Sequence, residues 1–192
     1  MSMTIKRRKD IETPRVLMHK IADIRGGVSI ATSDLGGDYI PEGAVISAAV
    51  NGVRHVVKLG KVANAVEAAA TAIKVSKYHN FKVGDFVLAK TGDKAVAITA
   101  IDTTNKSYDT LTIGSALGAI AKDAYIAEAE AAATGADSSK SALKYAAQAV
   151  VGTGKVAERG DNVITDAWVI GVTKGLALPD FIADGLKGIV NI

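Results

Sequence analysis

A glycine-rich turn ending in lysine, Gly152-Thr153-Gly154-Lys155, has the pattern closest to a phosphate-binding loop in this sequence. A Walker loop needs glycine where Ala149 stands, and serine or threonine where Val156 stands. A dinucleotide-binding fingerprint would have to open a helix, but Gly160 interrupts the segment a few residues later. The segment therefore predicts a β-turn, and neither a nucleotide nor another cofactor is expected.

Other side chains with chemical potential lie in patterns that predict no reaction. His19, His55 and His79 are too far apart for local metal spacing, and each is expected to be a solvated or hydrogen-bonded single histidine. Glu128 and Glu130 stand in an alanine-rich segment, where a solvated face explains them better than acid–base work. Hydrolase motifs are missing. Cysteine is also absent, which excludes thiolate zinc sites and disulfides. No catalytic, cofactor-binding or metal-binding residue is predicted, and the protein is expected not to be an enzyme.

Positive charge gathers near the N-terminus. Residues 1–25 hold seven basic and three acidic side chains, a net charge of +4, whereas the whole chain carries +3. Such an arm could contact an acidic protein surface or nucleic acid, and a solvated, mobile terminus is the alternative. No aromatic residue precedes Tyr39, so stacking on bases is missing and nucleic acid is disfavoured. The candidate partner-contact residues are Lys6, Arg7, Arg8, Lys9 and Arg15.

No segment has the pattern of a membrane span or a secretion signal. The basic start is interrupted by charged residues and Pro14 before any apolar run of the required length. No stretch approaches the roughly 18 uninterrupted apolar residues that a spanning helix needs. The chain is therefore expected to be made in the cytosol, without a membrane partner.

The strongest local structural signal is Asn51-Gly52 between two β-branched runs, residues 44–50 and 53–59. This dipeptide favours the type I′ turn of a β-hairpin. Residues 62–72 are alanine-rich and predict either a helix or an extended linker. Further on, alternating residues between turn signals predict four more strands, at 73–77, 86–90, 95–101 and 107–113.

The fold class that follows is mainly β, an antiparallel barrel or sandwich with minor helix and a flexible basic N-terminal arm. Residues 1–27 are predicted to form that arm, and residues 28–192 a β-rich body with an exposed loop at 130–142. Trp168 stands in a strong late strand and is predicted to lie in the core. The apolar end, residues 176–192, must be buried on its own body or on a neighbouring chain.

Several turn-and-strand segments resemble tailed-phage head fibre proteins, which decorate the capsid. The likeness extends over residues 34–192, and its segments are 39–47, 72–75, 78–85, 97–102, 107–114, 166–169 and 178–182. It implies a non-catalytic structural protein of a phage virion, attached to the major capsid protein as a homotrimer and assembled in the host cytoplasm. Long fibres carry a shaft of repeats or heptads, and this sequence has neither, which favours a compact decoration knob.

Two other classes of protein remain open from the residues. A β-rich binding or adhesion module that recognises a protein or glycan surface would show an exposed aromatic or charged groove. An enzyme would need a polar cleft with converging titratable groups.

Overall fold

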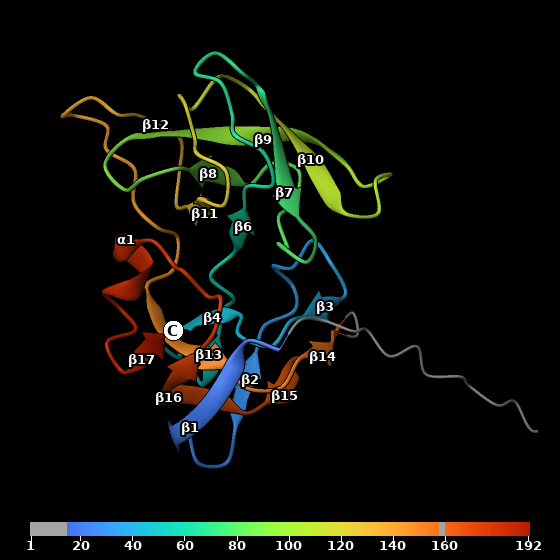
Figure 1. The fold of residues 1–192 in the computed structure, drawn as a ribbon, viewed down its shortest axis with the longest axis vertical. Coiled ribbons are helices and arrows are strands. Elements are labelled where there is room, and N and C mark those ends of the chain that lie inside the picture. The colour runs from blue at the N-terminus through green and yellow to red at the C-terminus, as the bar shows by residue number, and fades with distance from the viewer. Residues whose placement is uncertain (1–14, 158–159) are drawn as a thin grey trace, which may run out of the picture.

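The computed structural model describes residues 15–157 and 160–192, which form two β-rich lobes (Figure 1). Strands β1–β5 and β13–β17 build one lobe, and β6–β12 build the other. The chain therefore leaves the first lobe after β5 and returns to it at β13. Within the described residues the helical content is one four-residue helix, α1 (Asp180–Ala183). The predicted mainly β class with minor helix is confirmed.

The first lobe is organised around a sheet of order β1-β16-β13-β4, to which β17 adds beside β16. Two small sheets, β15-β2-β5 and β14-β3, complete it. Pairing is antiparallel except between β16 and β17 and between β2 and β5. The strands are β1 (Leu17–Asp23), β2 (Val28–Ile30), β3 (Tyr39–Ile40), β4 (Val45–Ser47), β5 (Val53–Arg54), β13 (Ala147–Val151), β14 (Lys155–Val156), β15 (Val163–Thr165), β16 (Ala167–Thr173) and β17 (Ile189–Asn191).

The second lobe is a seven-stranded antiparallel sheet of order β6-β11-β8-β9-β10-β7, with β12 added beside β9. An isolated bridge between Val62 and Val75 brings the segment after β6 beside β7, at the other end of this order, and the sheet does not form a closed barrel. Four of its strands match the four predicted from alternation. The strands are β6 (Leu59–Lys61), β7 (Ala72–Ser76), β8 (Phe86–Leu88), β9 (Lys94–Asp102), β10 (Tyr108–Ile113), β11 (Tyr125–Ala129) and β12 (Ala133–Thr134).

The predicted hairpin turn is confirmed. Asn51 and Gly52 have φ angles of 51° and 81°, as a type I′ turn requires. Val50 and Val53 exchange both backbone hydrogen bonds across it. Local sequence therefore decides this turn.

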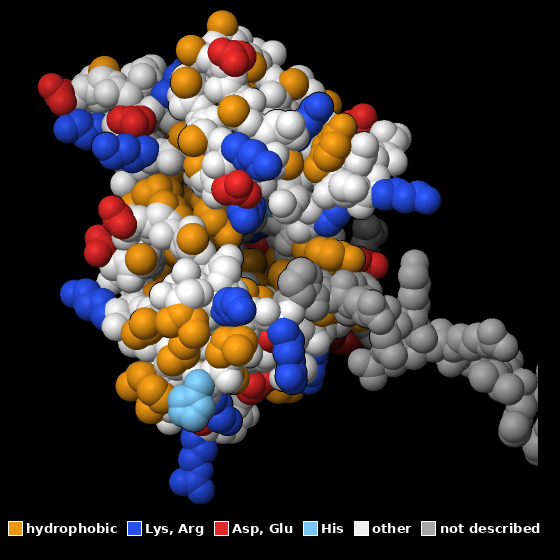
Figure 2. Space-filling view, in the orientation of Figure 1, with side chains coloured by type: hydrophobic (Ala, Val, Ile, Leu, Met, Phe, Trp, Pro, Cys, Tyr) orange, Lys and Arg blue, Asp and Glu red, His pale blue; other side chains and the backbone are white. Residues whose placement is uncertain are grey.

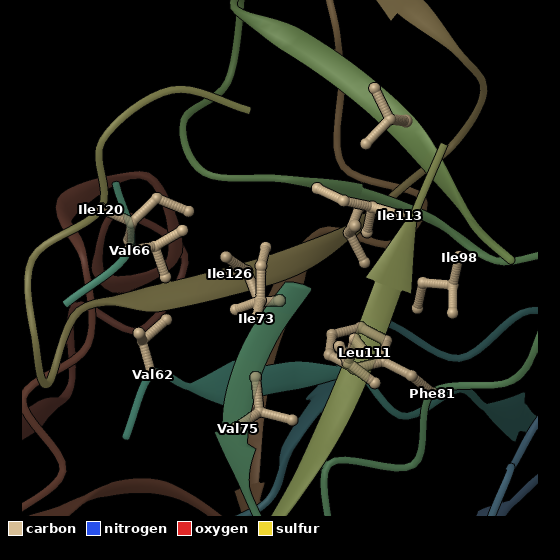
Figure 3. Close-up of a cluster of buried hydrophobic side chains, with 12 residues drawn as sticks. Val62, Val66, Ile73, Val75, Phe81, Ile98, Leu111, Ile113, Ile120 and Ile126 are labelled. Atoms are coloured by element: carbon tan, nitrogen blue, oxygen red, sulfur yellow. The ribbon is translucent and has the colours of Figure 1, made fainter. Parts of the chain in front are cut away.

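Residues 62–72 contain no helix, so the extended alternative is correct. Val62 and Val66 make isolated bridges to Val75 and Ile120, and both valines are buried in the core of the second lobe. Burial of these spaced valines against the sheet outweighs alanine's helical preference, which is a weak prior. That core is drawn in Figure 3 and consists of Val62, Val66, Ile73, Val75, Phe81, Val87, Val96, Ile98, Leu111, Ile113, Ile120 and Ile126.

Trp168 is half-buried rather than a core residue. It stands in β16 and packs against the cluster around Ile182 and Leu186, and its Nε1 donates to Asp166 Oδ2 at 3.2 Å. In the apolar C-terminal end, Ile182 and Leu186 are buried on the chain's own body, whereas Val190 and Ile192 are exposed. Leu59, Leu143 and Phe181 pack against clusters of both lobes and so connect them.

The predicted boundary at residue 27 is wrong for the part of the arm that the structure describes. Leu17–Asp23 is strand β1, which pairs along the length of β16. Its side chains are mostly exposed, which explains why its charges suggested a free arm. The loop predicted at 130–142 is largely exposed, but Ala133 and Thr134 within it form β12.

Candidate functional site

Of the predicted partner-contact residues, Lys6, Arg7, Arg8 and Lys9 lie outside the described residues. Arg15 is exposed just before β1. The two residues after it are anchored, because the backbone N–H groups of Val16 and Leu17 both donate to Glu42 Oε1, at 3.0 and 2.9 Å. Arg15 therefore lies at the start of a fixed strand.

An apolar patch lies on the sheet formed by β1, β16 and β17, and Figure 2 shows hydrophobic side chains gathered over these strands. Its members are Met18, Ile21, Ile170, Val190 and Ile192, all exposed. Val190 pairs with Val172, which is two residues from Ile170 and on the same face of β16. Neighbouring exposed apolar side chains of this kind mark an interaction surface more often than scattered ones do.

The loop between β7 and β8 holds the second candidate. Tyr78 and Asn80 both have left-handed φ angles, 66° and 61°, a conformation that costs free energy for non-glycine residues. Asn80 Nδ2 donates to Tyr39 O at 3.2 Å, and the turn at Gly36 packs directly on the loop. A side chain on Gly36 would collide with Phe81 O, so close approach of the two segments requires glycine there. These contacts hold the strained loop in place.

His79 is buried in this loop, where the sequence predicted a solvated or hydrogen-bonded side chain. The Phe81 N–H donates to His79 Nδ1 at 3.0 Å, so the remaining proton of the neutral ring is on Nε2. Nε2 lies 3.2 Å from Asp109 Oδ2, but the contact lacks hydrogen-bond geometry. Burial lowers the pKa of His79 below its ordinary 6.5, against the opposing charge of Asp109.

Two cavities of about 280 and 390 Å³ adjoin the loop, and both are lined by Tyr78, His79 and Asn80. The Tyr78 ring is partly exposed and meets Tyr39 edge-on, with centroids 5.3 Å apart. Asn80 Oδ1 and His79 Nε2 are buried polar atoms without a hydrogen-bond partner among the described residues. The loop therefore places a partly exposed aromatic ring beside two buried polar atoms that lack a hydrogen-bond partner among the described residues.

The third candidate is a polar group that lies where the lobes meet. His55 Nδ1 is 2.7 Å from Asp34 Oδ2, and Tyr145 donates to the same oxygen at 3.2 Å while its ring stacks on His55. Burial opposes ionisation of Asp34, but these hydrogen bonds outweigh it and hold its pKa below the ordinary 3.8. Within the described residues no serine or threonine hydroxyl bonds to the His55 ring, so the pair lacks the nucleophile of a hydrolase triad.

The fourth group is a buried ion-pair cluster around Lys58, just before β6. Its Nζ lies 2.6 Å from Asp85 Oδ2 and 3.1 Å from Glu128 Oε1. Lys144 also bonds Glu128 Oε1, at 2.8 Å. Glu128, expected on a solvated face, is instead buried in β11, whereas Glu130 is exposed. Local sequence patterns could not reveal this cluster, because its members are far apart in the chain and β11 lies in an alanine-rich segment.

The part of the chain that the structure describes has neither a metal-binding cluster nor a membrane-spanning helix. Residues 15–157 and 160–192 contain no group of three or more histidines or carboxylates placed to hold a metal ion. Over the same residues no helix has the length and apolar character that crossing a bilayer requires. Comparison with family models, with curated proteins and with solved structures finds no match for this chain.

Proposed function

We propose that this chain is a non-catalytic structural protein of a phage virion, a head fibre or decoration protein on the capsid surface. The observation that carries the proposal is the position of the segments that resemble head fibre proteins. They lie in both lobes, in strands β3, β4, β7, β9, β10 and β16 and in helix α1. The resemblance therefore involves the buried framework of the molecule and not one surface loop.

Contacts between these segments support the same proposal. The segment 39–47 meets the segment 78–85 through the hydrogen bond from Asn80 Nδ2 to Tyr39 O. Segments 72–75 and 107–114 pair along β7 and β10. If the resemblance reflects a shared fold, the similar segments must lie next to one another in space. A chance likeness of separate turns carries no such requirement.

The apolar patch supports assembly with other copies of this chain. A homotrimer with closed symmetry would cover such a patch in each subunit and leave no open contact for runaway growth. Arg15 lies at the start of β1, the edge strand that contributes to the patch. A basic side chain at the edge of the assembled patch suits an acidic surface of the capsid protein.

Co-sedimentation of the full chain with capsids assembled from the major capsid protein tests this role. The expected result is saturable binding with a fixed number of copies per capsid. Binding that stays proportional to the concentration of the chain, or no binding, would contradict the proposal. The Arg15→Glu variant should bind more weakly, and the Lys106→Glu variant, changed in an exposed loop of the other lobe, should bind normally.

The loop at Tyr78 favours one alternative, a binding module for a glycan. An exposed aromatic ring beside a buried donor and a buried acceptor suits a hydroxyl-rich, uncharged ligand. A glycan array with the full chain and with the Tyr78→Ala variant tests it. Retention of a glycan by the wild-type chain alone would favour this function, and no retention would reject it.

A further inference from the structure

Lys58, Asp85 and Glu128 are arranged on one face of three neighbouring strands. The sheet order is β6-β11-β8, so the strand bearing Glu128 lies between the strands that follow Lys58 and Asp85. Glu128 N–H donates to Lys58 O, which makes these residues cross-strand neighbours. Glu128 also pairs with Val87, whose side chain points to the same face as that of Asp85, two residues earlier. The backbone therefore directs all three side chains to one point.

Burial of this group is nearly complete. The side chains of Lys58, Asp85 and Glu128 are 1%, 12% and 3% exposed. A buried ion pair carries a large desolvation cost, which only partly returns as attraction between the charges. Glu128 Oε2 adds to that cost, because it is buried without a hydrogen-bond partner among the described residues. A reaction that removes both charges would relieve the cost.

We propose that Lys58 and Asp85 condense into an intramolecular isopeptide bond, with Glu128 as the proton-transfer group. Lys58 Nζ loses a proton to Glu128 and attacks Asp85 Cγ, forming the N–C bond. The C–O bond of the former carboxylate then breaks, and its oxygen leaves as water. One ammonium and one carboxylate become one amide and one water molecule, so atoms and charge balance without an oxidant or cofactor.

The positions of the surrounding groups suit each step. Nζ donates a hydrogen bond to Asp85 Oδ2 at 2.6 Å, so the amino and carboxyl groups that would join are held in direct contact. Glu128 Oε1 is 3.1 Å from the same Nζ and can accept its proton. The Lys82 N–H donates to Asp85 Oδ2 at 2.8 Å, where it would stabilise negative charge on the tetrahedral intermediate. Exclusion of water strengthens these interactions.

The bond would link residues 27 positions apart and close a loop that contains β6 and β7. A covalent link of this kind restricts the unfolded chain, as a disulfide does, and the chain has no cysteine for disulfides. The inference rests on the geometry of these three side chains and is independent of the proposed role in a virion.

Intact-mass spectrometry of the denatured full-length chain tests the proposal. The mass should fall below that of the unmodified chain by one water molecule, and digestion should yield a branched peptide that contains both Lys58 and Asp85. An unmodified mass, or a water loss without the branched peptide, would overturn the inference. The wild-type measurement is decisive whether or not any variant folds.

Variants assign the roles. Lys58→Arg keeps the positive charge but removes the nucleophile, and Glu128→Gln keeps the shape but removes the proton acceptor. Both should retain the unmodified mass, and the Lys58→Arg chain should unfold at a lower temperature than the linked wild type. Lys61→Ala is the matched control, since Lys61 and Asp123 form an exposed ion pair at 3.1 Å and are expected to stay unlinked. That variant should lose water as the wild type does, and water loss in Lys58→Arg would contradict the assignment.

Discussion

His79 shows at the scale of one residue how burial changes the chemistry of a side chain. Its Nδ1 accepts the Phe81 N–H, so protonation of Nδ1 would break a buried hydrogen bond. Lys77 also lowers the pKa of His79 and Asp85 raises it, and both effects are smaller than those of burial and Asp109. The folded protein therefore favours the neutral ring, whereas the unfolded chain binds a proton near pH 6.5.

Acid should destabilise the fold through His79. Because the folded pKa is lowered, the unfolded state binds more protons below pH 6.5, and stability falls as pH decreases through that window. Denaturant unfolding between pH 7.5 and 5 should show this loss. His79→Asn keeps an acceptor for the Phe81 N–H without titrating, so its profile should be flatter. Asp34, whose pKa lies below 3.8, loses its contribution only at more acidic pH. If the stability of the wild type and that of His79→Asn fell equally with decreasing pH, the prediction would be contradicted.

At the scale of secondary structure, the turn at Gly52 has a local and measurable cost. The Gly52 φ of 81° is unfavourable for a residue with Cβ, although a Cβ there would meet nothing within 4 Å. Gly52→Ala should therefore lower the free energy of unfolding by about 1 kcal/mol through conformation alone. Gly114→Ala is the control, since Gly114 lacks a left-handed φ and has space for a methyl group. Chemical denaturation compares them, and equal effects would refute the conformational explanation.

Strand β1 should contribute to stability, contrary to its prediction as a separable arm. Glu42 accepts two backbone N–H bonds at its start, and a charged acceptor of this kind contributes about 2 kcal/mol. Glu42→Ala should lower the free energy of unfolding by roughly that amount, and Glu42→Gln by less. Deletion of residues 15–25 should lower the thermal midpoint further, because β16 loses its partner strand. A thermal midpoint that is unchanged by this deletion would instead support the prediction that these residues belong to a separable arm.

At the scale of the whole molecule, two lobes share packing through a few side chains and leave one apolar patch uncovered. We expect self-association through that patch. Light scattering of the wild-type chain should give three times the 19.7 kDa chain mass at micromolar concentration. The double variant Ile170→Lys and Val190→Lys should return to the chain mass, because burying these charges in an interface is costly.

A matched control separates the patch from general surface hydrophobicity. Ile164 in β15 is as exposed as the patch residues but lies in another sheet, so Ile164→Lys should leave the oligomer intact. A wild-type mass of 19.7 kDa would reject self-association, and a dimer would reject the number three alone. Dissociation by Ile164→Lys would place the interface elsewhere.

Features that depend on neighbouring residues could be predicted from the amino-acid sequence. Asn51-Gly52 specifies its turn because both positions adopt positive φ. Alternation of apolar residues predicted β7 to β10, since one face of each strand is buried in the same core. The mainly β class followed from these local signals. Helical propensity at 62–72 misled because burial of Val62 and Val66 outweighs it.

Contacts between polar groups could not be predicted in this way, because they depend on how distant strands pair in the folded chain. Lys58 lies 27 residues from Asp85 and 70 from Glu128, and they converge because strand order in the sheet differs from order in the chain. Likewise β1 pairs with β16 across most of the sequence, so its exposed charges could not be distinguished from those of a free arm. Burial and long-range pairing convert isolated charges into an ion-pair cluster, and neither can be determined from neighbouring residues alone.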